Sequence, residues 1–275
     1  MRLTLASVLI LLAPVAASAA DVAPAYKTPM YSPAPAAGWT VTIGLEGRYL
    51  PSYDGADSMD LTAVPVFGMR RAGSHAKFRS PRDGVSFSLY DANNFSIGPV
   101  GKLKRKRKES DHADLRGLGD VDWTVEVGVF AEYWWTPWLR TRAEIRNGIG
   151  GHHGLVGDLT ADAVYQFAPA WQLSGGPRLS LASGSAVDPY FSVNGVQSLA
   201  SGLPVYDAGG GIRSYGLGAQ LRYEVTPQWG TYAYVEYERL AGDIADSPLV
   251  AQRGSVNQTT IGAGITYSFD VALPF

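Results

Sequence analysis

The chain has 275 residues, and its 23 lysines and arginines nearly balance 25 aspartates and glutamates, for a formal net charge of −2. This balance gives no general attraction to nucleic acid, and the lack of cysteine excludes disulfides, cysteine-ligated zinc and thiol nucleophiles. Only 17% of residues are charged, whereas 32 are glycine, 15 tyrosine and 7 tryptophan. Soluble domains carry about 25% charged residues, so the composition favours a β protein that shows an apolar surface to something other than water.

The N-terminal residues predict export. Residues 1–2 supply a positive charge, residues 3–15 are almost wholly apolar, and small residues at 17–20 suit a signal peptidase. We therefore predict a signal peptide at residues 1–20. Residues 21–37 contain four prolines and are predicted to be an extended periplasmic linker. No later stretch approaches the roughly 18 apolar residues of a membrane-spanning helix.

Residues 38–275 show the period of two that is typical of amphipathic β-strands. We predict twelve strands, at 39–50, 61–70, 74–80, 84–90, 94–102, 121–135, 139–149, 157–168, 171–182, 213–225, 229–240 and 258–275. Strands of soluble proteins are usually about 5–6 residues long. Most of the predicted strands are longer and suit the 9–11 residues that a tilted strand needs to cross a bilayer.

The connections between strands alternate in length. Short turns with a Pro-Trp or Pro-x-Trp sequence stand at 136–138, 168–171 and 226–229, where proline sets the turn and tryptophan suits a membrane interface. The segments on the other side, at 51–60, 103–120, 150–156, 183–212 and 241–257, are mostly long. Short periplasmic turns and long external loops are typical of outer-membrane barrels. We predict an all-β fold, a transmembrane antiparallel up-and-down barrel of about twelve strands in the outer membrane of a Gram-negative bacterium.

Charged side chains on the strands are predicted to face the lumen, because an arginine facing lipid at the midplane costs about 2–4 kcal/mol. The predicted lumen charge ladder consists of Glu126, Glu132, Arg140, Arg142, Glu144, Arg146, Arg222, Glu224, Glu236 and Glu238. Two interpretations stay open: a selectivity ladder in a pore, and a mixed-sign salt-bridge network that fills a narrow barrel. The similar numbers of both signs favour the network, and Tyr232 and Tyr234 add bulk.

A basic run opens the predicted external loop 103–120. It comprises Lys102, Lys104, Arg105, Lys106, Arg107 and Lys108. In a cytosolic protein such a run would suggest nuclear targeting or nucleic-acid contact, which export excludes. Lipopolysaccharide phosphates are the nearest anions and the candidate partner. A merely solvated loop and a polyanionic ligand are the alternatives.

The loops offer no convincing active site. His152 and His153 lie in the segment GGHHG, but no nucleophile, base and orienting group accompany them. Acidic loop residues could supply oxygen ligands to Ca²⁺; these are Asp54, Asp57, Asp60, Asp243 and Asp246. Solvated loop acids are the commoner explanation. We therefore predict no catalytic residue, no metal and no cofactor.

The C-terminal residues alternate toward an aromatic end. Tyr267, Phe269, Val271, Leu273 and Phe275 stand at every second position. This pattern resembles the signal that the barrel-assembly machinery recognises during insertion. Pro274 is unusual within it, because proline cannot donate to a β-ladder.

Seven short segments carry a family resemblance through their order and spacing. They are YLPSYDGAD (49–57), LGDVD (118–122), VEVG (125–128), SGLPVY (201–206), RLAGD (239–243), ADSPLV (245–250) and GITYSF (264–269). Together they resemble the MipA/OmpV family (MltA-interacting protein) of outer-membrane proteins. The resemblance implies a non-enzymatic barrel that scaffolds a murein transglycosylase and a peptidoglycan synthase, the latter a penicillin-binding protein. A small-solute porin is the main alternative, and a lipid-modifying enzyme is a further one.

Overall fold

The computed structural model describes residues 38–71, 78–92 and 94–272. The predicted signal peptide at 1–20 and the predicted linker at 21–37 lie outside these ranges, as do residues 74–77, Leu273 and Phe275.

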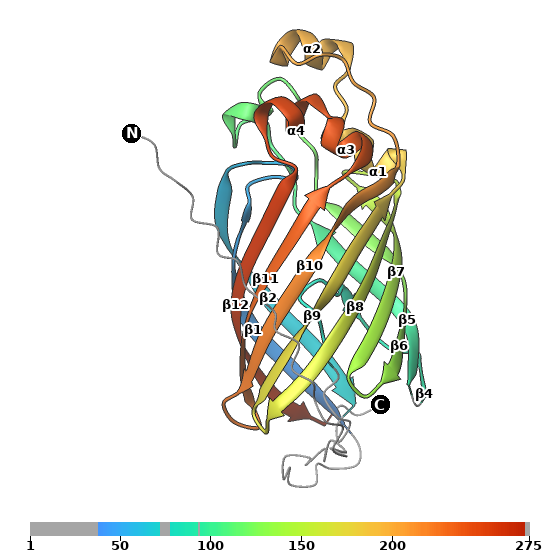
Figure 1. Cartoon of the computed structure of the whole chain (residues 1–275), viewed down its shortest axis with the longest axis vertical. Coiled ribbons are helices and arrows are strands. Elements are labelled where there is room, and N and C mark those ends of the chain that lie inside the picture. Colours follow the sequence, from blue (N-terminus) through green and yellow to red (C-terminus); the bar gives the residue numbers. More distant parts are fainter. Residues whose placement is uncertain (1–37, 72–77, 93, 273–275) are drawn as a thin grey trace, which may run out of the picture. The chain divides into compact units, whose positions relative to one another are not determined.

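The described residues form one antiparallel sheet that curls into a nearly closed barrel (Figure 1). Its long strands are β1 (Trp39–Pro51), β2 (Met59–Arg71), β5 (Phe95–Lys104), β6 (Thr124–Thr136), β7 (Leu139–Gly150), β8 (Leu155–Ala168), β9 (Trp171–Ala182), β10 (Gly211–Glu224), β11 (Trp229–Leu240) and β12 (Asn257–Val271). From β5 to β12 each long strand pairs with the next in sequence, and β1 pairs with both β2 and β12. The one break in the ring lies between β2 and the β3–β5 side, because no pairing joins β2 to either strand among the described residues. The predicted fold class is confirmed.

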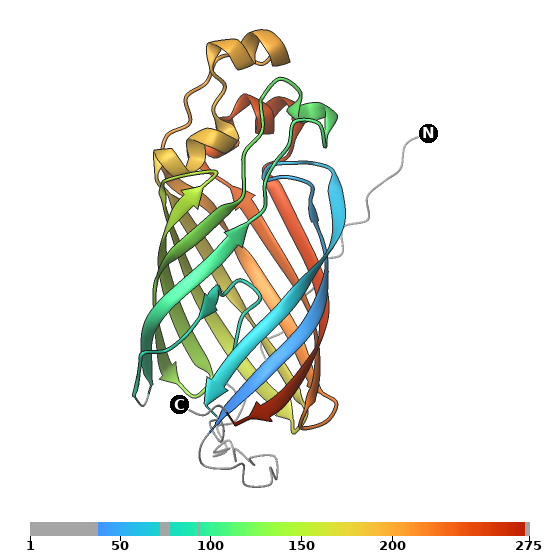
Figure 2. The same cartoon turned by 180° about the vertical axis from the view of Figure 1, so that it is seen from behind.

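The predicted strands at 74–80 and 84–90 need correction. Within the described residues, 78–84 form no strand, and the wall gains only the short β3 (Val85–Ser86) and β4 (Tyr90–Ala92), both paired with β5. Residues 80–86, which we call the luminal strap, end in β3 and send the side chains of Ser80, Arg82, Asp83 and Ser86 into the barrel. Figure 2 shows this stretch inside the wall, in front of the far strands.

The two ends of the barrel differ as the sequence predicts. One end, the short-turn end, holds the tight connections between β6 and β7, β8 and β9, and β10 and β11. At the other end, the long-loop end, the connections contain a 3₁₀ turn (Ala113–Leu115) and the helices α1 (Gly184–Phe191), α2 (Gly195–Ser201), α3 (Gly242–Asp246) and α4 (Pro248–Arg253). No helix among the described residues is long and apolar enough to cross a membrane.

The long loops pack into a cap with its own hydrophobic core. One cluster joins Val187, Tyr190 and Phe191 of α1 to residues of β11, α3 and α4. A second cluster joins loop residues 53, 56, 115, 118, 193 and 203 to Leu249 of α4. This cap was not predicted. Its clearest local signal is at α2, where Asn194 and Gln197 form a reciprocal capping box.

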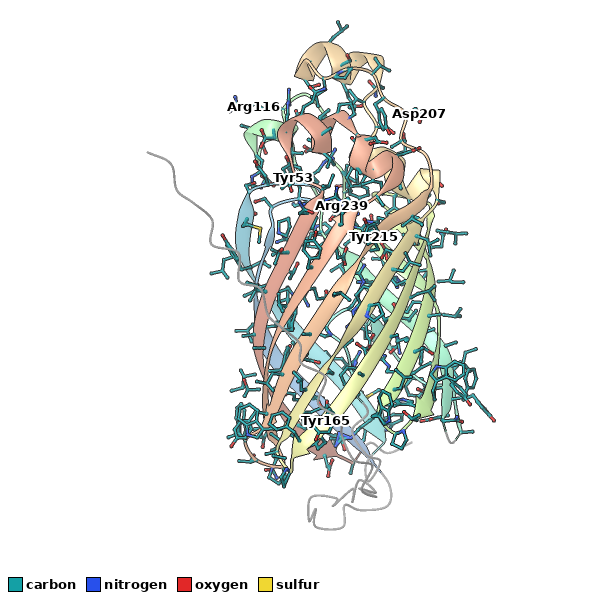
Figure 3. The ribbon with its side chains drawn as sticks, viewed as in Figure 1. Tyr53, Arg116, Tyr165, Asp207, Tyr215 and Arg239 are labelled. Atoms are coloured by element: carbon teal, nitrogen blue, oxygen red, sulfur yellow. The ribbon has the colours of Figure 1, made fainter. Side chains whose placement is uncertain are left out.

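The outer wall of the barrel is apolar and the inner wall is polar. Outward positions such as Leu45, Val129 and Leu217 are more than half exposed, whereas the inward carboxylates Glu46, Glu126 and Glu132 are buried. Aromatic side chains gather at the short-turn end around Tyr165 (Figure 3). Phe167, Trp171 and Tyr223 extend this group by ring stacking across β8, β9 and β10. Such an aromatic belt marks a membrane–water interface.

The cap core generates a first prediction. Phe191 is 2% exposed, and truncating a buried phenylalanine to alanine costs about 3–5 kcal/mol. The substitution Phe191→Ala should therefore loosen the cap while leaving the barrel wall intact. Limited proteolysis should cut within 183–210 at least tenfold faster.

The control is Leu199→Ala in α2, where the side chain is 91% exposed. Its proteolysis rate should match that of the wild-type chain. Equal cleavage of both variants would show that the cluster around α1 does not hold the cap together.

Candidate functional site

The barrel interior is organised around buried arginines of β7. The fully buried Arg140 donates to carboxylates from three elements: Nε to Glu132 of β6 at 2.9 Å, Nη1 to Asp162 of β8 at 3.1 Å and Nη2 to Asp83 of the strap at 2.6 Å. The strand register explains the first two contacts, because Arg140 lies opposite Asp162 and Glu132 lies opposite Arg142, the next inward residue of β7. One guanidinium thus ties two wall strands to the strap.

A second set of contacts lies nearer the long-loop end. Arg146 donates from Nε to Glu126 at 2.9 Å and from Nη2 to Asp158 at 2.5 Å, and it also bonds Glu144. Arg142 bonds Glu144 from the other side, with Nε at 2.8 Å from Oε1. Because Glu144 and Asp158 lie directly opposite each other on β7 and β8, the arginines separate two like charges.

The luminal strap is pinned by this network. Arg82 donates to Ser180 at 2.6 Å and pairs with Asp158 and Glu238. The backbone N–H of Gly84 donates to Glu144 at 3.1 Å, and Ser86 accepts from Arg142 at 3.0 Å.

On the far side of the strap, Ser80 accepts from Arg178 of β9 at 3.2 Å. The strap therefore contacts β7, β8, β9 and β11, which form more than one side of the lumen.

The opposite inner wall is filled by a glutamate between two tyrosines. Glu46 of β1 accepts from the hydroxyls of Tyr232 and Tyr234 of β11, the latter at 2.8 Å. The tyrosine rings lie over Gly262 and Gly264 of β12, where an added Cβ would come within 2.3 Å and 2.6 Å of ring atoms. These glycines make room for bulky side chains inside the barrel.

The predicted ladder is distributed unevenly along the lumen. Six of its members are buried in the network: Glu126, Glu132, Arg140, Arg142, Glu144 and Arg146. Glu236 and Glu238 of β11 pair with Arg178 and Arg82. Arg222 and Glu224 lie at the short-turn end of β10 and are much more exposed.

Several network residues were missed from the sequence. Asp158, Asp162 and Arg178 are inward residues of β8 and β9, and Arg82 and Asp83 belong to the strap. The period of two that identified the charges of β7 would also have found the first three. The last two lie at 81–83, between the predicted strands 74–80 and 84–90, where no inward-facing pattern was expected.

The barrel mouth beneath the cap contains a cavity of about 160 Å³. Asp54, from the β1–β2 loop, accepts from Lys104 of β5 at 2.8 Å and from Arg213 of β10 at 2.9 Å. Burial alone would raise the pKa of Asp54, but these two cations hold it well below its usual range. Phe191 and Val187 of the cap line the other side of the cavity.

The basic run is divided between interior contacts and the surface. Lys102 donates to the carbonyl of Arg82, Lys104 pairs with Asp54, and Arg107 donates to the carbonyl of Tyr190 at 2.6 Å. Burial lowers the pKa of Arg107. Arg105 and Lys106 are exposed, and Lys108 is half-buried.

The two histidines point in different directions. His152 is buried, with Nε2 at 3.2 Å from Glu126 and Nδ1 accepting from the N–H of Gly154, whereas His153 is exposed. No group of three or more acidic or histidine side chains placed to hold a metal ion occurs within 38–71, 78–92 and 94–272.

The described part of the C-terminal pattern lies on β12. The rings of Tyr267 and Phe269 are 5.9 Å apart, Trp229 lies 4.8 Å from Tyr267, and Val271 pairs with Trp39 of β1. Leu273 and Phe275 lie outside the described residues.

Comparison with known proteins places this barrel in a family. The family model described as MltA-interacting protein MipA matches residues 43–269. The chain belongs to the MipA family. Outer membrane protein OmpV of Vibrio cholerae is 36% identical over 68% of this chain and 62% of its own length. MltA-interacting protein of Escherichia coli is 26% identical over 76% of this chain and 82% of its own length.

The matched Vibrio proteins, OmpV and Omp26La of Vibrio anguillarum, are thus covered over less than two thirds of their length. Both Vibrio relatives are named as outer membrane proteins, and the described residues of this chain form a barrel with an apolar outer wall. The chain is therefore an outer-membrane barrel. Among solved structures, the KdgM porin is similar with a TM-score of 0.40 and 11% identity, covering 83% of this chain and 99% of that one. The COG4313 outer membrane channel from Pseudomonas putida F1 has a TM-score of 0.41 and 12% identity, covering 88% and 99%.

The network around β7 generates a second prediction. Arg140→Met removes one buried cation and leaves Asp83, Glu132 and Asp162 facing one another. Breaking a buried ion pair from one side costs about 3–5 kcal/mol, and urea unfolding followed by tryptophan fluorescence should show a loss of that size. The matched control is Arg222→Met at the exposed end of the ladder, expected within about 0.5 kcal/mol of wild type. Similar losses in both variants would contradict the network's role.

The barrel mouth generates a third prediction, on pH. Because the folded pKa of Asp54 lies below its usual value of about 3.9, its stabilising contribution is complete above that value. The contribution is lost as pH falls through the folded pKa. Asp54→Asn should therefore speed proteolysis of the 52–58 loop at pH 7 and pH 5 alike. A wild-type loop that loosens between pH 7 and pH 5 would contradict the assignment.

Proposed function

We propose that this MipA family member is a non-enzymatic structural barrel that holds murein partners at its short-turn end. The partners proposed are a lytic transglycosylase and a penicillin-binding protein. The short-turn end is proposed to face the periplasm, as is typical of outer-membrane barrels. Residues 21–37 would then lie on the same side as the partners.

The luminal network, with the strap bound to it, is the observation that carries this proposal. Conduction requires polar groups that bind a solute weakly enough to release it. Here the carboxylates of Glu132, Asp83 and Asp162 are already engaged by Arg140, and the strap contacts β7, β8, β9 and β11. Such an interior supports a structural role over a small-solute channel.

The names of relatives support the choice of partner. The Escherichia coli relative is called MltA-interacting protein, and its alignment covers most of both chains. The two Vibrio relatives are named as outer membrane proteins, and none of the three names gives an enzymatic activity, which supports the non-enzymatic part of the proposal.

Three further parts of the proposal concern assembly. Residues 1–20 would be removed on export, and the end of β12 would be recognised by the barrel-assembly machinery. Arg105 and Lys106, exposed at the long-loop end, would contact lipopolysaccharide phosphates; Arg105 also donates to Thr62 of β2 at 3.2 Å.

Binding of purified MltA to the barrel in nanodiscs tests the proposal. The wild-type chain should bind, and a variant with Ala170→Arg and Gln228→Arg should bind at least tenfold more weakly, because both turns lie at the short-turn end. Deleting residues 21–37 in a second variant tests the linker separately.

The matched control is Leu199→Arg, which adds the same charge at the long-loop end. It should bind as the wild-type chain does. No binding by a correctly folded wild-type barrel, or a loss confined to Leu199→Arg, would overturn the proposed function.

A further inference from the structure

The lipid-facing wall of the barrel carries a hollow of about 430 Å³. Its outward-facing lining comes from β5 to β9: Phe95, Ala131, Tyr133, Thr141, Ala143, Leu159, Ala161, Pro177 and Leu179. Apart from Thr141 and the tyrosine hydroxyl, these side chains are wholly apolar. Glu132, Arg142, Thr160 and Arg178 also line the hollow, but neighbouring residues of a strand point to opposite faces, and these four side chains face the lumen. The hollow therefore opens on the surface that meets hydrocarbon and backs onto the luminal network.

The strand register explains why the wall is hollowed here. Ala131, Ala143 and Leu159 lie side by side on β6, β7 and β8, and in the next outward row Thr141 lies opposite Ala161. The small side chains of these rows thus form a floor between two bulkier borders; they are Ala131, Thr141, Ala143 and Ala161. Phe95 and Tyr133, which are paired across β5 and β6, form one border. Leu159 and Leu179, paired across β8 and β9, form the other.

A break in the β8–β9 ladder adds to the hollow. Pro177 has no N–H to donate, and the backbone pairing is interrupted between Thr160 and Ala163. Arg178 compensates from inside the barrel, because its Nη1 donates to the carbonyl of Ala161 at 3.1 Å. The wall at this point is closed by a side chain, so an apolar occupant outside would meet no unsatisfied backbone oxygen at Ala161.

The hollow lies at the depth of acyl chains. Ala143 stands four residues beyond Leu139, the first residue of β7, which is about 13 Å along a strand and about 10 Å along the barrel axis at a tilt of about 40°. The aromatic belt, with Trp138 in the turn, marks the interface at the short-turn end. Because half of the hydrocarbon core is about 15 Å thick, the hollow falls within the leaflet at that end.

We propose that this hollow is a binding site for one acyl chain of a phospholipid from the leaflet at the short-turn end. Small side chains let the chain approach the barrel backbone, and the borders contributed by Phe95, Tyr133 and Leu159 hold it in place by packing. Dispersion and close fit, rather than a polar anchor, provide the selectivity. The site is independent of any murein partner.

A photoreactive phospholipid tests the site. Phosphatidylethanolamine with a diazirine in mid-chain is reconstituted with the full barrel, irradiated, and the cross-linked peptides are identified by mass spectrometry. Cross-links should concentrate on β6, β7 and β8 several-fold above the rest of the wall. Ala161→Phe, which fills the floor, should reduce them to the level of the other strands.

The opposite wall offers a matched control. Ala233, Ala263, Gly47 and Ala63 form a comparable row of small residues across β11, β12, β1 and β2. Ala263→Phe should leave the cross-links on β6–β8 unchanged. If Ala161→Phe disturbs folding, seen as loss of resistance to detergent at room temperature, Ala143→Leu replaces it.

Two results would overturn the proposal. One is an even distribution of cross-links around the wall, or one that Ala161→Phe and Ala143→Leu leave unchanged. The other is cross-linking between copies of the chain through position 161, which would assign the hollow to a second barrel instead of a lipid.

Discussion

The buried guanidinium–carboxylate contacts of β7 are the interaction on which the rest of the structure depends. Charged side chains cannot face lipid without a large cost, so the alternation of each strand sends them inward. Inside the barrel, a buried charge without a partner is also unfavourable, because it loses its hydration and gains no ion pair. Arg140 and Arg146 resolve this by each binding three carboxylates, and one of those six contacts is made by Asp83 of the strap.

Much of this could be predicted from the sequence, because a period of two determines both the strand and the direction of every side chain. The ten long strands, the two kinds of barrel end and the inward direction of the β7 charges follow from that rule. The strap does not, because residues 80–84 are a short, mostly polar segment with a proline and a glycine, and they lie inside the wall. There and at Ser86 the strap meets Arg140, Arg142 and Glu144. The cap was also missed, since its short helices depend on tertiary contacts around Phe191 and Leu249 more than on local pattern.

The molecule therefore contains two interiors built on different principles. The cap is held by apolar side chains from loops distant in sequence, as in a small soluble domain, whereas the barrel is held by ion pairs and tyrosine hydroxyls. Asp54 joins the two, because it belongs to a cap loop and pairs with Lys104 and Arg213 of the wall. The strap contacts span the middle of the lumen, and the contacts of Asp54 lie at its mouth.

Single-channel recording in a planar bilayer tests the central claim, that the strap and the network close the barrel. The wild-type barrel should give no conductance steps at moderate voltage. A variant with Arg82→Ala and Asp83→Ala, which removes the strap's two charged contacts, should give discrete steps. Steady ohmic steps from the wild-type barrel would contradict this claim, because they would show an open path past the strap and the network.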